Sequence, residues 1–237
     1  TVDGGAGADE LIADLSGYVT WRNPRDLQYW RVDEQGNRVQ VVGAGSSWSD
    51  IQSYLNYGGA NYLGSQYGEQ WLSYSNIEKV SLTATNLDGD YSWTGGSDLL
   101  IVVGQGGRYA GGSGVDTLCA DWSNSTVSAT FNSNVAEEQI FNGVTVNSIE
   151  RFLLKLGSGN DVLNILTSGS HEIWAGIGDD HISINNGTVY GEAGNDTIES
   201  SGGFVDGGSG NDIIRGMTYG TVDGGAGADE LIADLSG

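Results

Sequence analysis

Apolar residues in the second half of this chain alternate with polar ones over short stretches, and each stretch follows an aspartate. Residues 180–184 read Asp-His-Ile-Ser-Ile, and residues 196–199 read Asp-Thr-Ile-Glu. Alternation with a period of two is the pattern of a β-strand that turns one face to a core. Glycine-rich stretches separate these strands and are typical of tight turns. The pattern predicts short strands separated by turns.

A different pattern occupies the stretch of the chain that is richest in aromatic residues. Residues 27–32 and 38–42 are β-prone runs on either side of a turn-like sequence, and they predict a hairpin. Residues 48–55 predict one short helix, with Ser47 or Ser49 as its N-terminal cap.

A nine-residue motif organises the rest of the chain. It reads Gly-Gly-x-Gly-x-Asp-x-U-x, where U is a large apolar residue, and seven copies are recognisable. The copies begin at Gly4, Gly111, Gly157, Gly176, Gly191, Gly207 and Gly224, and a degenerate copy at 96–100 keeps only the second half. Because glycine and aspartate keep fixed places, the motif indicates one turn that is repeated many times.

These copies resemble the RTX nonapeptide repeats of secreted bacterial toxins, proteases, lipases, adhesins and surface-layer proteins. The resemblance covers residues 1–17 and about 94–237, but not 18–93. It implies an all-β fold, a parallel β-roll (β-solenoid) with stacked calcium-binding turns, to which 18–93 would add an aromatic-rich inserted subdomain. It also implies several Ca²⁺ ions and a secreted, extracellular location at a bacterial cell surface.

The chemistry of the motif agrees with calcium. Glycine reaches positive φ without steric cost, so the first six positions can bend tightly and aim several carbonyl oxygens at one point. The aspartate adds a carboxylate, and Ca²⁺ takes about six to eight oxygen ligands, more than one turn supplies. Two stacked turns would therefore share each ion. The candidate ligands are Asp9, Asp98, Asp116, Asp161, Asp180, Asp196, Asp212 and Asp229, with Gly5, Gly7, Gly112, Gly114, Gly157, Gly159, Gly176, Gly178, Gly194, Gly208, Gly210, Gly225 and Gly227.

The spacing of the aspartates predicts a ladder along one edge of the roll. Asp161, Asp180, Asp196, Asp212 and Asp229 follow one another at steps of 19, 16, 16 and 17 residues. RTX rolls carry two motifs per coil, whereas here only one half of each coil has the full motif, so we expect plain turns on the opposite edge. A metal-free solenoid with asparagine and aspartate turns is the alternative, but it does not explain the fixed positions of these residues.

Composition and charge limit the partners. Glycine accounts for 40 of the 237 residues, and 31 acidic residues against nine basic ones give a net charge of −22. Such a surface repels nucleic acid and anionic membrane, so we expect neither as a partner. A highly soluble or halophilic surface would also explain the charge, but not the spacing of the acids. Cys119 is the single cysteine, so no intrachain disulfide can supply rigidity, and metal is the usual alternative.

The first 17 residues of the chain recur at its end. Residues 1–17 and 221–237 are identical, at an offset of 221 − 1 = 220 residues. We interpret the chain as one repeat of a tandem array plus the start of the next, and an isolated duplication of the two ends is the alternative. The expected domains are a first coil at 1–17, the insert and a return strand at 18–93, the roll at 94–220 with a shorter insert at about 124–148, and the next repeat from 221.

Residues 18–93 hold five of the seven tryptophans. One interpretation is a small satellite core packed on the roll. The other is a contact surface for a neighbouring subunit or a surface glycan, because interfaces favour exposed Trp, Tyr and Arg. The candidate contact residues are Trp21, Trp30, Trp48, Trp71 and Arg31.

The sequence contains no H-E-x-x-H metalloprotease helix and no G-x-S-x-G nucleophile elbow. His171 and His181 are expected to be exposed turn and strand residues, and Cys119 a buried small residue. We therefore expect no enzyme. The leading hypothesis is a calcium-dependent structural repeat whose neighbouring copies stack into a surface fibre, filament or surface layer. The alternative is an adhesin repeat whose insert binds a glycan or a partner protein.

Overall fold

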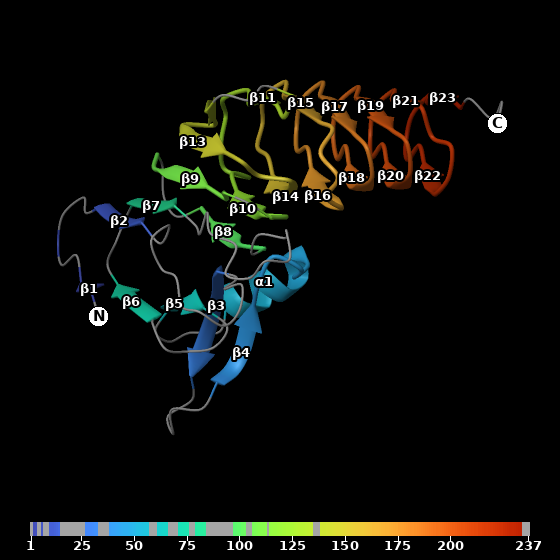
Figure 1. The fold of residues 1–237 in the computed structure, drawn as a ribbon. Coiled ribbons are helices and arrows are strands. Elements are labelled where there is room, and N and C mark those ends of the chain that lie inside the picture. Colours follow the sequence, from blue (N-terminus) through green and yellow to red (C-terminus); the bar gives the residue numbers. More distant parts are fainter. Residues whose placement is uncertain are drawn as a thin grey trace. The chain divides into compact units, whose positions relative to one another are not determined.

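The computed structural model describes residues 2–3, 6, 10–14, 27–32, 38–56, 61–65, 71–75, 79–83, 97–102, 106–112, 114–134 and 138–233. The chain divides into two compact units. Unit 1 comprises Thr1–Cys119 and Gly143–Ile149, and unit 2 comprises Ala120–Asn142 and Glu150–Gly237. Figure 1 shows strands in both units and, among the described residues, one helix, α1 (Trp48–Asn56). In the ranges given above, no helix is long and apolar enough to cross a membrane.

Unit 2 contains two parallel stacks of short strands. One stack consists, in spatial order, of β14 (Arg151–Lys155), β16 (His171–Trp174), β18 (Gly187–Tyr190), β20 (Gly203–Asp206) and β22 (Thr221–Asp223). The other consists of β11 (Thr130–Asn132), β15 (Val162–Ile165), β17 (His181–Ile184), β19 (Thr197–Ser200), β21 (Ile213–Arg215) and β23 (Glu230–Ile232). A further short strand, β12, covers Gln139–Phe141.

The chain passes alternately from one stack to the other, so each circuit, or coil, contributes one strand to each (Figure 1). Every pairing between successive coils is parallel, and the register places equivalent motif positions side by side. For example, Ile182 lies opposite Ile198, and Ile198 lies opposite Ile214. The predicted parallel β-solenoid is therefore confirmed, and we refer to residues 151–232 as the roll.

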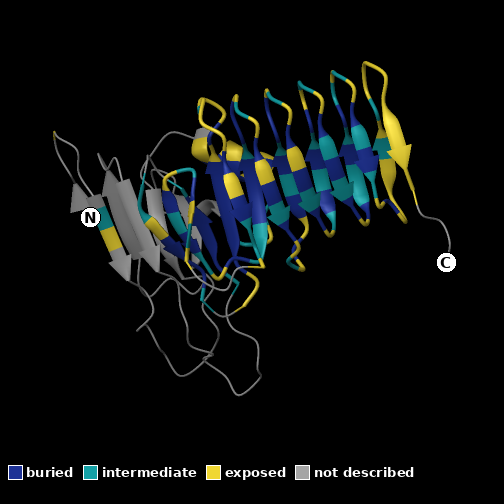
Figure 2. Ribbon diagram, turned by 90° about the horizontal axis from the view of Figure 1, so that it is seen from above, coloured by how far each residue is buried: buried dark blue, intermediate teal, exposed yellow. Residues whose placement is uncertain are grey.

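The core of the roll contains a row of buried apolar side chains from each stack, and Ile165 and Ile184 add a second buried side chain in β15 and β17. Leu163, Ile182, Ile198 and Ile214 come from one stack, and all are buried. Ile173, Val189 and Val205 come from the other stack and are also buried. Leu163, Ile182, Ile198 and Ile214 occupy the U position of the motif, which confirms that this position points inward. Figure 2 shows the alternation of buried and less buried residues along these strands.

Aromatic side chains thicken the core of unit 2 near its first coils. Phe131 lies between Phe141 and Phe152, with ring centroids 4.9 and 5.0 Å away, and Trp122 meets Phe141 edge-on at 4.8 Å. Such pairs add stabilisation beyond the area that they bury. The inward positions of β17 to β21 carry no aromatic residue, so the cross-section there is thinner.

Unit 1 combines a mixed sheet, antiparallel except for its first strand pair, with a further set of parallel strands. Its five-stranded sheet has the order β1 (Val2–Asp3), β6 (Trp71–Ser75), β5 (Asn61–Ser65), β3 (Leu27–Val32) and β4 (Arg38–Val42). Parallel pairs join β2 (Glu10–Asp14), β7 (Lys79–Thr83), β9 (Arg108–Ala110) and β13 (Val144–Asn147) in that order. Residues 117–119 of β10 (Thr117–Asp121) pair with β8 (Leu99–Ile101).

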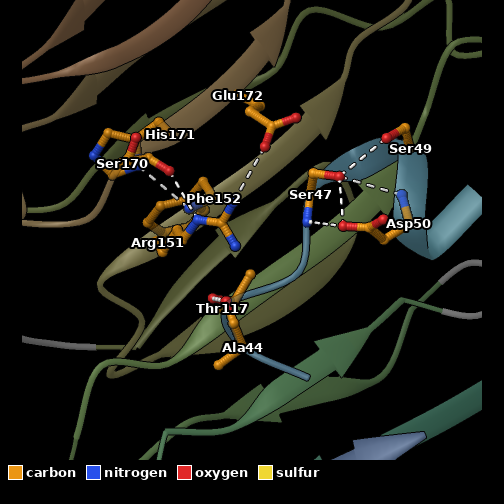
Figure 3. A network of polar contacts seen from close by, with 10 residues as sticks. All are labelled: Ala44, Ser47, Ser49, Asp50, Thr117, Arg151, Phe152, Ser170, His171 and Glu172. Carbon is orange, nitrogen blue, oxygen red and sulfur yellow. Dashed lines mark hydrogen bonds and ion pairs between the residues drawn. The ribbon is translucent and has the colours of Figure 1, made fainter. Parts of the chain in front are cut away.

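The hairpin and the helix predicted in the insert are both present. β3 and β4 pair antiparallel, and α1 covers Trp48–Asn56. Ser47 is the cap, because its Oγ accepts a hydrogen bond from the Asp50 N–H at 3.2 Å and Asp50 Oδ2 accepts one from the Ser47 N–H at 3.0 Å (Figure 3). The buried face of α1 carries Trp48, Ile51 and Tyr54.

Replacing an inward residue of the roll should be costly. Ile198 is 0% exposed, and Ile198→Ala should lower the free energy of unfolding by about 2–5 kcal/mol through lost burial and a cavity. Ile177 is 64% exposed, and alanine already occupies the equivalent place in the next coil at residue 193. Ile177→Ala should therefore change the free energy of unfolding by less than about 0.5 kcal/mol. Urea unfolding in calcium measures both, and equal losses would contradict the assigned core.

Candidate metal-binding turns

The glycine-rich turns before β17, β19, β21 and β23 lie directly on one another. Parallel bridges connect them through Ile177, Ala193, Ser209 and Ala226, the third position of each motif. The fourth position is always a glycine with positive φ, for example 142° at Gly194 and 135° at Gly210. Other residue types adopt this conformation only with strain. The second position also has positive φ, and Glu192 (φ 69°) occupies it in one coil where the others have glycine.

The neighbouring coil gives a second reason for glycine at the fourth position. A Cβ placed on Gly194 would collide with the carbonyl oxygen of Gly178, and one on Gly210 with that of Gly194. Successive coils are therefore as close as their main chains allow. The predicted turn glycines from Gly176 to Gly227 all lie in these turns, and Gly157 and Gly159 lie in the turn before β15.

The motif aspartates connect each coil to the one before it. The main-chain N–H of Asp161 donates to Oδ1 of Asp180 at 2.7 Å, and that of Asp180 donates to Oδ1 of Asp196 at 2.8 Å. The same bond runs from Asp196 to Asp212 at 2.8 Å and from Asp212 to Asp229 at 3.0 Å. We refer to these five residues as the aspartate ladder. They stack along one edge of the roll, as their spacing predicts.

The second carboxylate oxygen of three ladder residues has a different environment. Within the described part of the chain, Oδ2 of Asp180, Asp196 and Asp212 is buried and makes no hydrogen bond. An unsatisfied buried carboxylate oxygen is costly, and native proteins avoid it unless a ligand or a proton compensates. This oxygen is therefore the one that a cation would take.

Main-chain carbonyl oxygens lie close to these second oxygens. A Cβ added to Gly207 would meet Oδ2 of Asp212 at 2.6 Å and the carbonyl oxygen of Gly224 at 2.5 Å. A Cβ on Gly191 would collide with the corresponding pair, Oδ2 of Asp196 and the carbonyl oxygen of Gly207. A carboxylate oxygen of one turn and a carbonyl oxygen of the next thus approach one small space. Two acceptors in one place fit a hard cation, and oxygen is the ligand that Ca²⁺ prefers.

No acidic cluster is required for this arrangement. Among the residues that the structure describes, no group of three or more His, Cys, Asp or Glu side chains could hold a metal ion. The turns of Asp180, Asp196 and Asp212 each contribute one buried carboxylate, and a carbonyl oxygen of the next turn lies close to that of Asp196 and that of Asp212. A bound ion would therefore draw most of its ligands from the main chain of two turns, as the sequence analysis expects.

Burial changes the acidity of the ladder. Removal from water raises the pKa of Asp180 to about 8 and that of Asp196 to about 6. It also raises the pKa of Asp161 and Asp212. Main-chain hydrogen bonds partly oppose this rise, whereas neighbouring carboxylates add to it at Asp180, Asp196 and Asp212. Without a cation, the row therefore retains protons at a pH where exposed aspartates are fully charged.

A second ladder, which the sequence analysis missed, runs beside the first. Oδ1 of Asn160 accepts a hydrogen bond from the Asp179 N–H at 3.1 Å, and Oδ1 of Asp179 accepts one from the Asn195 N–H at 2.8 Å. In the same way, Oδ1 of Asn195 accepts a hydrogen bond from the Asn211 N–H at 2.9 Å, and Oδ1 of Asn211 accepts one from the Ala228 N–H at 2.9 Å. These four side chains form the asparagine ladder. The signal in the sequence is an Asn or Asp directly before the motif aspartate in four copies.

The remaining candidate ligands lie in unit 1. Asp98 and Asp116 are buried, and the Asp98 N–H donates to Oδ1 of Asp116 at 2.8 Å, the same bond as in the ladder. Gly112 and Gly114 have positive φ of 92° and 133°. Asp9, Gly5 and Gly7 lie outside the described residues.

Among the candidate contact residues of the insert, the structure describes the side chain of Trp48. Trp48 is 6% exposed, which fits a satellite core and leaves its ring unavailable to a partner. Trp30 and Arg31 lie in β3 and Trp71 lies in β6, but their side chains are outside the description, and so is Trp21.

One histidine prediction is wrong. His171 was expected to be exposed, but it is fully buried at the start of β16, where alternation with Ile173 turns it inward. Its Nδ1 accepts a hydrogen bond from the Phe152 N–H at 3.2 Å (Figure 3). Burial lowers the pKa of His171 to about 4, so the ring is neutral. His181 is exposed and Cys119 is buried, as predicted.

The turns on the opposite edge of the roll have a different sequence. Asn185 and Asn186 connect β17 to β18, and Ser201 and Gly202 connect β19 to β20. Ser200 Oγ accepts a hydrogen bond from the Gly202 N–H at 3.3 Å, a bond local to the turn. The described turns on this edge contain no motif aspartate.

Without calcium, the stability of the roll should fall as the pH rises from about 4 to about 8. An unfolded aspartate has a pKa of 3.8, whereas folded Asp196 and Asp180 have pKa values of about 6 and 8. The folded state therefore binds extra protons, and this stabilisation is complete below pH 3.8 and is lost as the pH passes through the folded values. The folded fraction in calcium-free buffer, followed by circular dichroism from pH 4 to pH 8, tests this, and Asp180→Asn should remove most of the change above about pH 6. A stability that rises with pH would contradict the assignment.

Comparison with known families agrees with this geometry. A family model described as the RTX calcium-binding nonapeptide repeat (4 copies) matches residues 186–204 and 203–218. A search of curated proteins finds no match. The matched residues contain the turns before β19 and β21, with Asp196 and Asp212. Together, the family match and the stacked parallel strands fit an RTX β-roll repeat protein.

Proposed function

We propose that this chain is a calcium-dependent, extracellular structural repeat, and that tandem units stack into a rigid fibre, filament or layer at a bacterial surface. The observation that carries the proposal is the aspartate ladder, in which buried Oδ2 atoms without hydrogen bonds face carbonyl oxygens of the next coil. In this proposal the chain has a mechanical role and no catalytic one.

Calcium would be held between successive turns. Asp180, Asp196 and Asp212 would bind it through Oδ2, with carbonyl groups such as those of Gly207 and Gly224. The ion would neutralise buried carboxylates that otherwise need protons, and it would connect two coils. In the folded roll, the Oδ1 hydrogen bonds hold each carboxylate in place, so that its Oδ2 stays within the turn.

Calcium dependence links folding to location. Metal binding that occurs only in the folded state adds its free energy to folding. Extracellular modules of this type bind Ca²⁺ at roughly 10⁻⁴–10⁻³ M, well above the free concentration inside cells. The chain would therefore fold after export, which suits a secreted protein with a thin core and a net charge of −22.

The adhesin alternative assigns the insert a binding role. Trp48 is the one candidate contact residue whose side chain the structure describes, and it is buried. No described residue supports a glycan site in the insert. We therefore keep the structural repeat as the proposed function.

A matched pair of substitutions separates the metal role of the ladder from its charge. Asp196→Asn keeps an Oδ1 acceptor for the Asp180 N–H but loses the charged Oδ2, and it should raise the calcium concentration needed for folding by roughly tenfold. Asp179→Asn also removes one negative charge, but at an exposed site where asparagine already stands in three other coils. It should leave the calcium requirement unchanged. Calcium titrations followed by circular dichroism compare the two, and equal shifts would argue against the proposal.

Removing calcium should unfold the roll, and supplying it should build rods. The β-sheet signal in circular dichroism should be large in millimolar Ca²⁺ and mostly lost in EGTA at neutral pH, because the ladder then has neither ions nor enough protons. Electron microscopy of a chain with several repeats in calcium should show thin, straight particles. Equal β content in both conditions would sink the calcium claim, and flexible or globular particles would sink the fibre claim.

A further inference from the structure

The 17-residue segment that occurs twice in the chain is seen in two structural settings. Its first copy contains β1 and β2 in unit 1, and its second copy contains β22 and β23 in unit 2. Because the two sequences are identical, both settings describe what the same segment can do.

The first copy pairs with strands that come later in the chain. Val2 and Asp3 lie opposite Tyr74 and Ser75 of β6. β2 lies along the whole of β7, with Leu11 opposite Val80 and Ile12 opposite Ser81. Both strand pairs, β1 with β6 and β2 with β7, are parallel.

The second copy pairs with strands that come earlier in the chain. Val222 lies opposite Val205 of β20, and Leu231 lies opposite Ile214 of β21. Again all pairs are parallel. The first copy therefore pairs with strands that follow it in the chain, and the second copy pairs with strands that precede it.

A strand inside the roll does both at once. β19 pairs with β17 before it and with β21 after it, because a strand has two hydrogen-bonding edges. In the described part of the chain, β2 and β23 each stand at the end of their sheet and use one edge. The preceding edge of β2 and the following edge of β23 are thus available.

The hydrogen bonds show which amide of β23 faces the available edge. The Glu230 N–H donates to the Asp212 carbonyl at 2.8 Å, and the Ile232 carbonyl accepts from the Gly216 N–H at 3.1 Å. Residues of a strand alternate between its two edges, so Glu230 and Ile232 face the preceding coil. Leu231, between them, faces the edge that has no strand.

The last coil also leaves apolar surface uncovered. The U residue is 0% exposed at Ile198 and 1% exposed at Ile214, whereas Leu231 in the same position is 55% exposed. Figure 2 shows the last strand of the roll as exposed along its length. A following coil would cover Leu231 in the way that each earlier coil is covered.

We propose that this segment is the joint between consecutive repeats, a single coil shared by both. Its preceding edge would pair with β20 and β21 of one repeat, and its following edge with β6 and β7 of the next. Leu231 would then lie opposite the next repeat's Val80, and Ile232 opposite its Ser81. The inference rests on the proposed tandem stacking and gives it a register, in which the solenoid continues across the joint without a linker.

The joint lacks one of the two ladders. The asparagine ladder ends at Ala228, which donates its N–H to Asn211 Oδ1 but has no side-chain oxygen to offer the next coil. Across the joint, the connection would therefore depend more on strand pairing than it does inside the roll. We expect hydrogen exchange at the joint to be faster than inside the roll but far slower than at a free edge.

The test compares the present chain with a longer one in which residues 18–237 are repeated once after residue 237. Hydrogen exchange is resolved by residue in millimolar calcium. The Leu231 N–H should exchange about a hundredfold or more slowly in the longer chain than in the present one. The Glu230 N–H, already bonded to Asp212, should change much less and serves as the internal control. Exchange at Leu231 that is fast in both chains, or slow in both, would overturn the joint.

A cysteine pair tests the register. In the longer chain with both Cys119 residues replaced by alanine, Ile232→Cys combined with Ser81→Cys in the second copy should form a disulfide on mild oxidation. Ile12, the equivalent of Ile232 in the first copy, lies opposite Ser81 and is 73% exposed, so we expect this pair of positions to point outward. Ile232→Cys with Leu82→Cys in the second copy is the control, one residue out of register and on the other face. A disulfide in the control but not in the first pair would overturn the register.

The same exchange data separate this inference from the proposed function. If β19 becomes protected only with calcium while Leu231 stays fast in the longer chain, the joint is wrong and the calcium roll stands. If β19 is equally protected without calcium while Leu231 slows in the longer chain, the joint stands and the calcium dependence is wrong.

Discussion

The close approach of successive turns is the constraint on which the rest of the roll depends. Main chains stacked at the spacing of neighbouring strands exclude any side chain at the fourth motif position, as the collision at Gly194 shows. The same closeness lets each aspartate reach the main chain of the coil before it through Oδ1. The other oxygen is then left inside the turn, away from water and beside a carbonyl group. The demand for a cation is thus a consequence of how tightly the glycines let the turns stack.

The thin core explains why the turns matter so much. One or two aliphatic residues per strand, such as Val189 in β18 or Ile182 and Ile184 in β17, bury little surface per coil, and the single cysteine offers no cross-link. Hydrogen bonds between successive coils therefore contribute a large share of the stability of the roll. The two ladders act in opposite directions, since the aspartate ladder accepts from the preceding coil and the asparagine ladder accepts from the following one. Each turn is thus held by hydrogen bonds from the coils on both sides.

The sequence was sufficient wherever the deciding signal is local. The motif fixes turn, aspartate and inward residue within nine positions, so the parallel solenoid, the single edge of aspartates and the buried U residues could be predicted. The hairpin of β3 and β4 and the Ser47 cap of α1 also depend on neighbours in the chain. Features set by the next coil were missed. The burial of His171 depends on Phe152, 19 residues away, and the asparagine ladder depends on N–H groups 16 to 19 residues away.

The most direct measurement is a crystal structure of the chain grown in calcium, with anomalous scattering used to locate the ions. The account predicts an ion beside Oδ2 of Asp180, Asp196 and Asp212, each between two successive turns and bound by carbonyl groups of both. Ordered turns with no ion at these oxygens, or with Oδ2 bonded to a protein donor in their place, would contradict it.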